Sequence, residues 1–125
     1  MDERTEAAAR HIVDSAMKVH RALGPGLLES AYEHCLEYEF GLRGVPCRRQ
    51  AAIPITYEGL QLEVGYRLAL LVAERAIVEI KSVDALIPIH QAQLLTYLRF
   101  SGHRLGFLIN FNTALLKNGL KRLAL

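Results

Sequence analysis

The sequence lacks tryptophan and contains only two cysteines and four prolines among its 125 residues. Cys35 and Cys47 have no CxxC spacing, which argues against a zinc site or a disulfide scaffold. No apolar run reaches the roughly 18 residues that cross a bilayer, and the charged start MDERTEAAARH contains no apolar signal region. We therefore expect a cytoplasmic protein with no membrane partner.

The chain also lacks a strong excess of either charge. Its formal net charge is +2, which is too small to indicate a nucleic-acid partner without a local basic patch. Hydrophobic residues make up 51% and charged residues 22%, as in a folded globular protein rather than a disordered one. A chain of 125 residues can build a core without disulfides, so we expect a single domain over residues 1–125.

Apolar spacing predicts the order of the elements. Apolar residues recur every three or four positions over residues 3–23 and 27–42, which indicates two amphipathic helices separated by Gly24-Pro25-Gly26. A strand over residues 47–57 is expected to form a hairpin with residues 60–64 through the turn Glu58-Gly59. Further strands are expected over 65–72, 76–83, 104–111 and 120–125, with a third helix over 89–101. This order predicts an α/β sandwich around a mixed sheet.

The run GYRLALLVAERAIVEIKS, residues 65–82, contains two opposite charges on a strand. Strand alternation places Glu79 and Lys81 on one face and Val78 and Ile80 on the other. Burying either charge is costly unless a partner, a metal ion or a ligand compensates it. An ion pair at a sheet edge meets this need. So does a metal-dependent phosphodiesterase site, where the carboxylate binds a hard cation and the lysine assists the attacking water or the transition state.

Two helical pairs carry further candidate side chains. Glu29 and Tyr32 are three residues apart on the second helix, and Gln93 and Tyr97 are four apart on the third, so each pair shares a helix face. A plain structural interpretation is available for both pairs. Glu29 suits the positive end of a helix beside a core tyrosine, and a glutamine often faces solvent.

The motifs together resemble a known family. GLLESAY, residues 26–32, fits the pattern GxxExxY, and IVEIKS, QAQLLTY and FLINF follow in order. From about residue 12 to residue 123 the chain is similar to the small bacterial and archaeal GxxExxY proteins of the PD-(D/E)XK nuclease-like superfamily. This resemblance implies a restriction-endonuclease-like sandwich, with a mixed central sheet flanked by helices and an αβββαβ core. It also implies metal-dependent hydrolysis of nucleic-acid phosphodiesters.

The resemblance implies roles for individual residues. Glu79 would be the metal-binding carboxylate, assisted by the main-chain carbonyl of Ile80, and Glu29 would contact the metal directly or through water. Lys81 would position the water or stabilise the transition state. The cofactor in active relatives would be Mg²⁺ or Mn²⁺. Gln93 and Tyr97 resemble a QxxxY element that supports the site or touches the nucleic-acid backbone.

One position departs from the family pattern. The strand GYRLALLV carries Ala69 where the family has a metal-binding aspartate, and alternation places Ala69 opposite Glu79. A methyl group cannot bind a cation, and Mg²⁺ usually takes one or two carboxylates. We therefore expect metal affinity and hydrolysis to be severely weakened, with no strong ion at Glu79 and Lys81 paired directly with Glu79. Ala69 fits either a natural non-cleaving relative or an alanine introduced to inactivate the enzyme.

Arginine supplies most of the positive charge, eleven of the fifteen cationic residues, which suits bidentate contacts with phosphate. We expect DNA or RNA to contact Arg48, Arg49 and Arg67. The alternative function is a non-catalytic module that binds nucleic acid or protein on the nuclease scaffold. A homo-oligomer also stays open, because a hairpin edge can pair with another copy.

Overall fold

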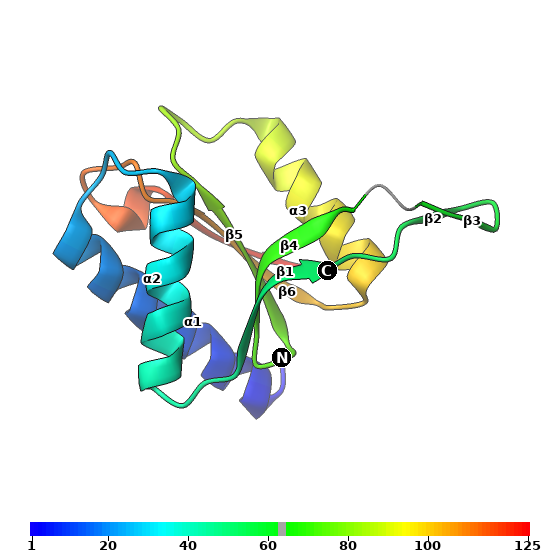
Figure 1. The fold of residues 1–125 in the computed structure, drawn as a ribbon, viewed down its shortest axis with the longest axis horizontal. Helices are drawn as coiled ribbons and strands as arrows, with labels where there is room; N and C mark the ends of the chain where they lie inside the picture. Colours follow the sequence, from blue (N-terminus) through cyan, green and yellow to red (C-terminus); the bar gives the residue numbers. More distant parts are fainter. Residues whose placement is uncertain (63–64) are drawn as a thin grey trace.

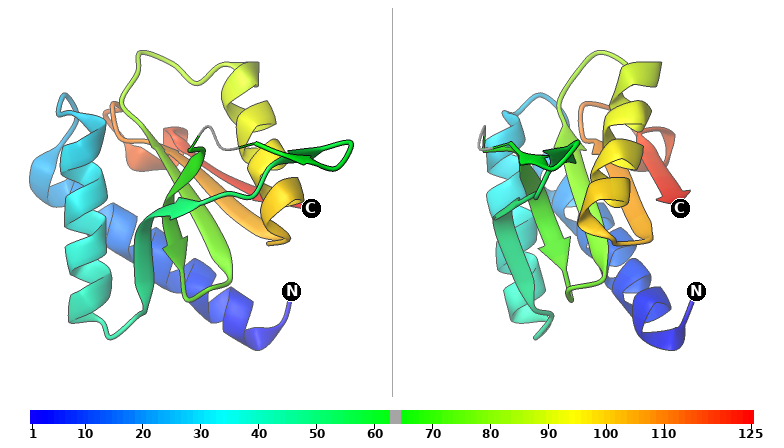
Figure 2. Two further views of the ribbon diagram at one scale, coloured as in Figure 1. Left: turned by 45° about the vertical axis from the view of Figure 1, so that its right-hand side comes forward. Right: turned by 90° about the vertical axis from the view of Figure 1, so that its right-hand side faces the viewer.

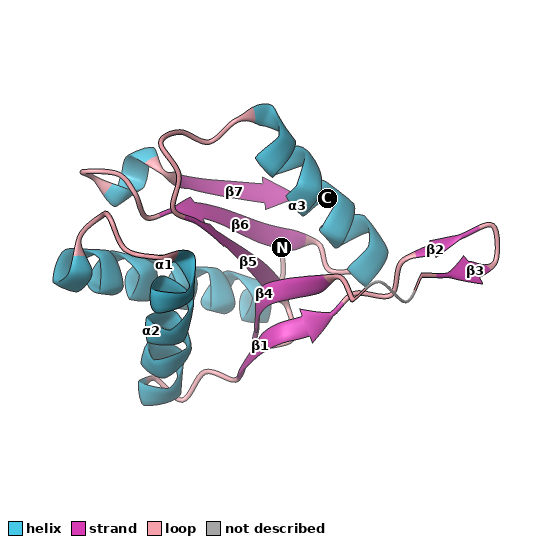
Figure 3. Cartoon of the chain, turned by 45° about the horizontal axis from the view of Figure 1, so that its top comes forward, coloured by secondary structure: helices cyan, strands magenta, loops and turns pink. Residues whose placement is uncertain are grey.

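A five-stranded mixed sheet forms the centre of the fold (Figures 1 and 3). The computed structural model describes residues 1–62 and 65–125. The strand order is β1-β4-β5-β6-β7, with β5 and β6 parallel and the other neighbours antiparallel. The strands are β1 (Cys47–Ala52), β4 (Arg67–Val72), β5 (Ala76–Lys81), β6 (Leu105–Asn110) and β7 (Leu120–Ala124).

Helices cover both faces of this sheet (Figure 2). One apolar cluster joins α1 (Glu3–Leu23) and α2 (Glu29–Leu42) to one face, and a second joins α3 (Pro88–Ser101) to the other. The order α2-β1-β4-β5-α3-β6 is the expected αβββαβ core, so the restriction-endonuclease-like fold class is confirmed. Among the described residues, no helix combines the length and the apolar character that a bilayer span requires.

Alternation along β5 sorts its residues between the two clusters as predicted. Val78 and Ile80 pack in the cluster beneath α1 and α2, and Ile77 packs in the cluster beneath α3. Glu79 and Lys81 share the parity of Ile77 and therefore belong to the α3 side of the sheet.

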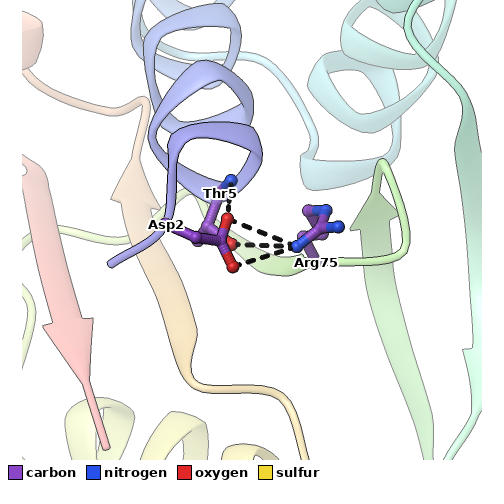
Figure 4. Close-up of polar contacts among 3 residues, drawn as sticks. All are labelled: Asp2, Thr5 and Arg75. Atoms are coloured by element: carbon purple, nitrogen blue, oxygen red, sulfur yellow. Dashed lines mark hydrogen bonds and ion pairs between the residues drawn. The ribbon is translucent and has the colours of Figure 1, made fainter.

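The start of α1 is tied to the turn between β4 and β5 (Figure 4). The side chain of Asp2 caps the helix by accepting a hydrogen bond from the Thr5 amide at 2.8 Å. Arg75, in the β4–β5 turn, pairs with the same carboxylate at 3.2 Å. These contacts connect the first residues of the chain to the central strands.

The expected hairpin between residues 47–57 and 60–64 forms, but only close to its turn. Its turn at Glu58-Gly59 is confirmed, but β2 (Thr56–Tyr57) and β3 (Leu60–Gln61) form a separate two-stranded ribbon that projects beyond α3 (Figure 1). Pro54 has no amide hydrogen and interrupts the ladder, so β1 ends at Ala52 and pairs with β4 instead. Residues 63–64 of the expected strand lie outside the described residues.

Two residues of β6 hold the surroundings of β5 in place. A Cβ at Gly106 would lie 3.0 Å from the side chain of Leu94, so the glycine allows α3 to pack closely on the sheet. The buried Asn110 side chain accepts from the Val83 amide at 3.1 Å and donates to the Val83 carbonyl at 2.9 Å. The chain that leaves β5 is therefore anchored to the end of β6.

Candidate active site

The candidate site lies where β4 separates from β5. The antiparallel ladder runs from the pair Val72↔Ala76 to the pair Leu70↔Val78, after which Ala69 and Glu79 would be opposite each other. Instead of continuing the ladder, the Ala69 amide donates to the Glu79 carboxylate at 2.8 Å. The predicted position of Ala69 opposite Glu79 is therefore confirmed.

Glu79 is a buried carboxyl group with a raised pKa. Its side chain lies in the interior, with 7% of the residue exposed. Burial raises its pKa to about 7, against the opposing effects of the Ala69 amide and the charge of Lys81. The negative charges of Glu33 and Glu29 add to the increase, which places both acids in electrostatic range of Glu79.

Lys81 does not pair with Glu79, contrary to the prediction. Its ammonium group donates a long hydrogen bond of 3.5 Å to the side-chain oxygen of Gln93 on α3. Within the described residues no ion pair joins Lys81 to a carboxylate. The reason is the position of each group: Glu79 is enclosed and receives the Ala69 amide, whereas Lys81 lies at the end of β5, next to α3.

Glu29 reaches the same end of β5 from the first turn of α2. Its carboxylate accepts from the Ser82 amide at 3.4 Å, and the Ser82 hydroxyl donates to the Leu27 carbonyl at 2.6 Å. The residue that follows Lys81 thus contacts both the beginning of α2 and the loop before it. This junction places Glu29 next to Ser82, the residue that follows Lys81.

The tyrosine of the GxxExxY motif has a structural role in the same junction. The buried Tyr32 hydroxyl donates to the Gly24 carbonyl at 2.6 Å and accepts from the Leu27 amide at 3.1 Å. Its ring stacks on Phe111 with 4.4 Å between centroids. Tyr32 therefore holds the loop that delivers Glu29, and the motif couples one acid to one positioning residue.

The two predicted residues of α3 both lie near the site. Gln93 contacts Lys81, as described, whereas Tyr97 is largely buried against the sheet. Burial raises the pKa of Tyr97, and the charges of Glu79 and then Tyr66 add to the increase. Tyr97 thus lies within electrostatic range of Glu79. Through Gln93 and Tyr97, α3 therefore approaches both Lys81 and Glu79 of β5.

Glu33 and Gln50 also belong to this region, although neither was predicted. The Gln50 amide donates to the Glu33 carboxylate at 2.6 Å, and Glu33 is buried. Gln50 has a φ of 57° and faces Ala69 between two bridged pairs of β1 and β4. The signal for Glu33 was its spacing of four residues from Glu29, which places both acids on one face of α2.

The three arginines predicted to contact nucleic acid have different partners. Arg48 forms a bidentate pair with Glu74 at 2.7 and 2.9 Å, at the opposite end of β4 from Ala69. Arg49 lies near two glutamates of α2, at 3.6 and 4.0 Å. Arg67 donates to the Gln50 carbonyl at 3.2 Å and forms no ion pair with a described carboxylate.

The residues present do not complete a site for Mg²⁺ or Mn²⁺. No three histidine, cysteine, aspartate or glutamate side chains converge as metal ligands in the part of the chain that the structure describes. One oxygen of Glu79 is already engaged by the Ala69 amide. The side chain of Ile80 is apolar and buried, so its main-chain carbonyl is the one group with which it could bind a cation. Mg²⁺ usually takes one or two carboxylates together with water, and Ala69 lies next to Glu79 where a second carboxylate would be needed.

The fold and this arrangement of Glu29, Glu79, Lys81, Gln93 and Tyr97 define a nuclease-like protein. The family model described as the PD-(D/E)XK nuclease superfamily matches residues 6–123, so the chain belongs to that superfamily. No curated protein and no solved structure gives a significant match.

Proposed function

We propose that this chain is a nuclease-like domain in which hydrolysis of nucleic-acid phosphodiesters is impaired by Ala69. The observation that carries the proposal is the contact between the Ala69 amide and Glu79. It puts a methyl-bearing residue beside the buried carboxylate, where a second acid would be needed to bind a cation. We also propose that residues 1–125 form one domain of the GxxExxY type, which the match over residues 6–123 and the motif at residues 26–32 support.

The remaining groups retain features that suit a phosphodiester. Lys81 is a cation whose partner among the described residues is the neutral Gln93, so its charge is available to a phosphate oxygen. Glu29 orients the Ser82 amide at the end of β5. Tyr97 lies on α3, within electrostatic range of Glu79. Lys81 and Gln93 would then position the nucleic-acid backbone, and the missing function would be metal binding by the carboxylates.

A second candidate is a module that binds nucleic acid without cutting it. Neither Lys81 nor Arg67 forms an ion pair with a carboxylate of the described residues. This favours the second function, because both cations are available to phosphate. Both candidates predict binding by the wild-type chain. They differ in what an acid at position 69 does.

The test compares the wild type with the Ala69→Asp variant on single- and double-stranded DNA and RNA, with Mn²⁺ and with EDTA. We expect Mn²⁺-dependent cleavage by Ala69→Asp and little or none by the wild type. The matched control is Ala69→Asn, which has nearly the same shape but lacks the anionic ligand. A Lys81→Ala change in the Ala69→Asp background should abolish the restored activity.

Four outcomes separate the candidates. Cleavage by Ala69→Asp alone supports the impaired nuclease. Binding by all variants without cleavage supports the binding module. Cleavage by the wild type at the rate of Ala69→Asp would show that Ala69 does not limit the chemistry. Absence of both binding and cleavage would contradict both nucleic-acid functions and point to a protein partner.

A further inference from the structure

A pocket of about 300 Å³ lies between α3 and the segments that flank the β2–β3 ribbon. This volume is at the lower end of the range for small-molecule pockets, roughly 300–1,000 Å³. Its walls are mainly apolar and aromatic, and a single heterocycle is the kind of group that they would enclose. The residues that line it include Ile55, Leu62, Tyr66, Gln93, Tyr97 and Phe100.

Two tyrosines approach this pocket from different elements. Tyr97 comes from α3, and Tyr66 comes from the segment just before β4. Tyr66 is 45% exposed, which is high for a large aromatic residue. Exposed aromatic rings beside a cationic site are the platforms on which proteins stack unpaired bases.

Gln93 connects the pocket to the candidate active site. It lines the pocket, and its side-chain oxygen also accepts the hydrogen bond from Lys81 at 3.5 Å. A phosphate held by Lys81 would therefore have its neighbouring base within reach of the pocket. The glutamine amide offers both a donor and an acceptor to a base edge.

We propose that this pocket holds one unstacked nucleobase next to the phosphate that Lys81 contacts, so that the domain acts on single-stranded nucleic acid or unpaired ends. A base inside a duplex is stacked on both faces and paired at its edge, and it cannot enter a pocket without leaving the stack. The proposal rests on the proposed function and adds the substrate class to it.

The test measures binding by fluorescence anisotropy in EDTA, with oligonucleotides of about 12 nucleotides, a length within the usual range of single-strand sites. The probes are a DNA strand, the RNA strand of the same sequence, their duplexes, and a DNA strand with abasic positions at its centre. The proteins are the wild type, Tyr66→Ala and the control Tyr66→Phe, which retains the ring. Thermal unfolding checks that each variant is folded.

We expect the wild type to prefer single strands to duplexes and intact to abasic strands. Tyr66→Ala should weaken single-strand binding roughly 10-fold, the effect of removing one base–aromatic contact. Tyr66→Phe should bind like the wild type. Tighter binding of the DNA or of the RNA strand would identify the preferred sugar, and either result supports the pocket.

Equal affinity for intact, abasic and duplex probes would overturn the base pocket and leave the proposed function standing, because binding would then depend on phosphate alone. An unchanged affinity of Tyr66→Ala would also overturn it. Absence of binding to every probe at low salt would overturn the pocket and the proposed function together. The abasic comparison uses the wild type, so it decides the question even if Tyr66→Ala does not fold.

Discussion

Glu39 on α2 and Glu79 on β5 have the same small exposed fraction, 7%, but Glu79 lies in the interior, whereas Glu39 is covered near the surface by the side chains of two cations. The Glu39 carboxylate pairs with Arg43 at 2.9 Å and Lys18 at 3.0 Å, and the hydrogen bonds from these two cations lower its pKa. Glu79 receives one backbone amide and no ion pair from the described residues, and burial raises its pKa to about 7.

The difference separates a structural region from a candidate functional one. Around Glu39, two cations from α1 and the end of α2 compensate the charge, so the acid helps to join the helices. Around Glu79, no described cation pairs with the carboxylate, so its negative charge would be compensated by a ligand that binds the site. A buried acid with a raised pKa and no permanent partner is a frequent feature of functional sites. The chain keeps this feature although Ala69 stands opposite.

The largest expected effect on stability comes from placing a second carboxyl group next to Glu79. Ala69→Asp adds a second carboxylate beside Glu79, and the repulsion between them should lower the free energy of unfolding at pH 8 by about 3 kcal/mol without metal. Saturating Mn²⁺, at roughly 100 times its Kd, should restore about 3 kcal/mol. Thermal unfolding with and without Mn²⁺ measures both effects.

The Ala69→Asn variant and the wild type serve as controls for this change. Neither gains an anionic ligand, so Mn²⁺ should leave the Tm of both nearly unchanged. A rise in the wild-type Tm equal to that of Ala69→Asp would show that the natural set of ligands already binds the ion.

The next largest effect on stability comes from removing the buried negative charge of Glu79. Glu79→Gln should stabilise the protein at pH 8 by about 2 kcal/mol, since the folded-state pKa of about 7 lies above the ordinary glutamate pKa of 4.5. The sign follows from proton binding: the folded state holds the proton more tightly, so the wild type loses stability as pH rises from 4.5 to 7. The glutamine still accepts the Ala69 amide.

Chemical denaturation at pH 4 and pH 8 measures this difference. The two proteins should have similar stability at pH 4, where Glu79 is protonated in both the folded and unfolded states, and should diverge above it. A variant less stable than the wild type at pH 8 would show that the Glu79 charge is compensated after all.

Glu39→Gln should have a smaller effect of the opposite sign. The folded-state pKa of Glu39 is lowered, so its contribution to stability is present above pH 4.5 and is lost as pH falls through the folded-state value. The expected change at pH 7 is a fall in Tm of about 2–4 °C, because Lys18 is largely exposed and its pair is screened. The difference from the wild type should shrink toward pH 3. An increase in Tm at pH 7 would contradict the comparison.

The sequence was most informative where the relevant geometry is local. Strand alternation placed Glu79 on the face of Ile77, and alternation together with the family pattern placed Ala69 opposite Glu79. Both depend on a two-strand hairpin with a short turn, whose register follows from a few residues. The turn Glu58-Gly59 was found for the same reason.

Contacts between distant elements were harder to predict. The partner of Lys81 is Gln93 on α3, and that contact depends on how closely the helix approaches the sheet at Gly106. Glu33 could have been noted from its spacing to Glu29, but its burial depends on Gln50 of β1. Such contacts follow from helix–sheet packing, which no short-range pattern encodes.

The smallest predicted effects are on nucleic-acid affinity. They distinguish an arginine whose charge is already paired with a glutamate from one whose charge is available to a phosphate. Arg48 is engaged by Glu74 in a bidentate pair, whereas Arg67 donates to a main-chain carbonyl. If the domain binds single-stranded nucleic acid, Arg67→Ala should weaken binding several-fold and reduce the slope of log affinity against log salt by about 1, as expected for one lost phosphate contact. Arg48→Ala should leave both nearly unchanged, because Glu74 already neutralises its charge. Equal losses of affinity from both variants would show that nucleic acid displaces Glu74 from Arg48. The Arg48–Glu74 ion pair, at the far end of β4, would then belong to the binding surface.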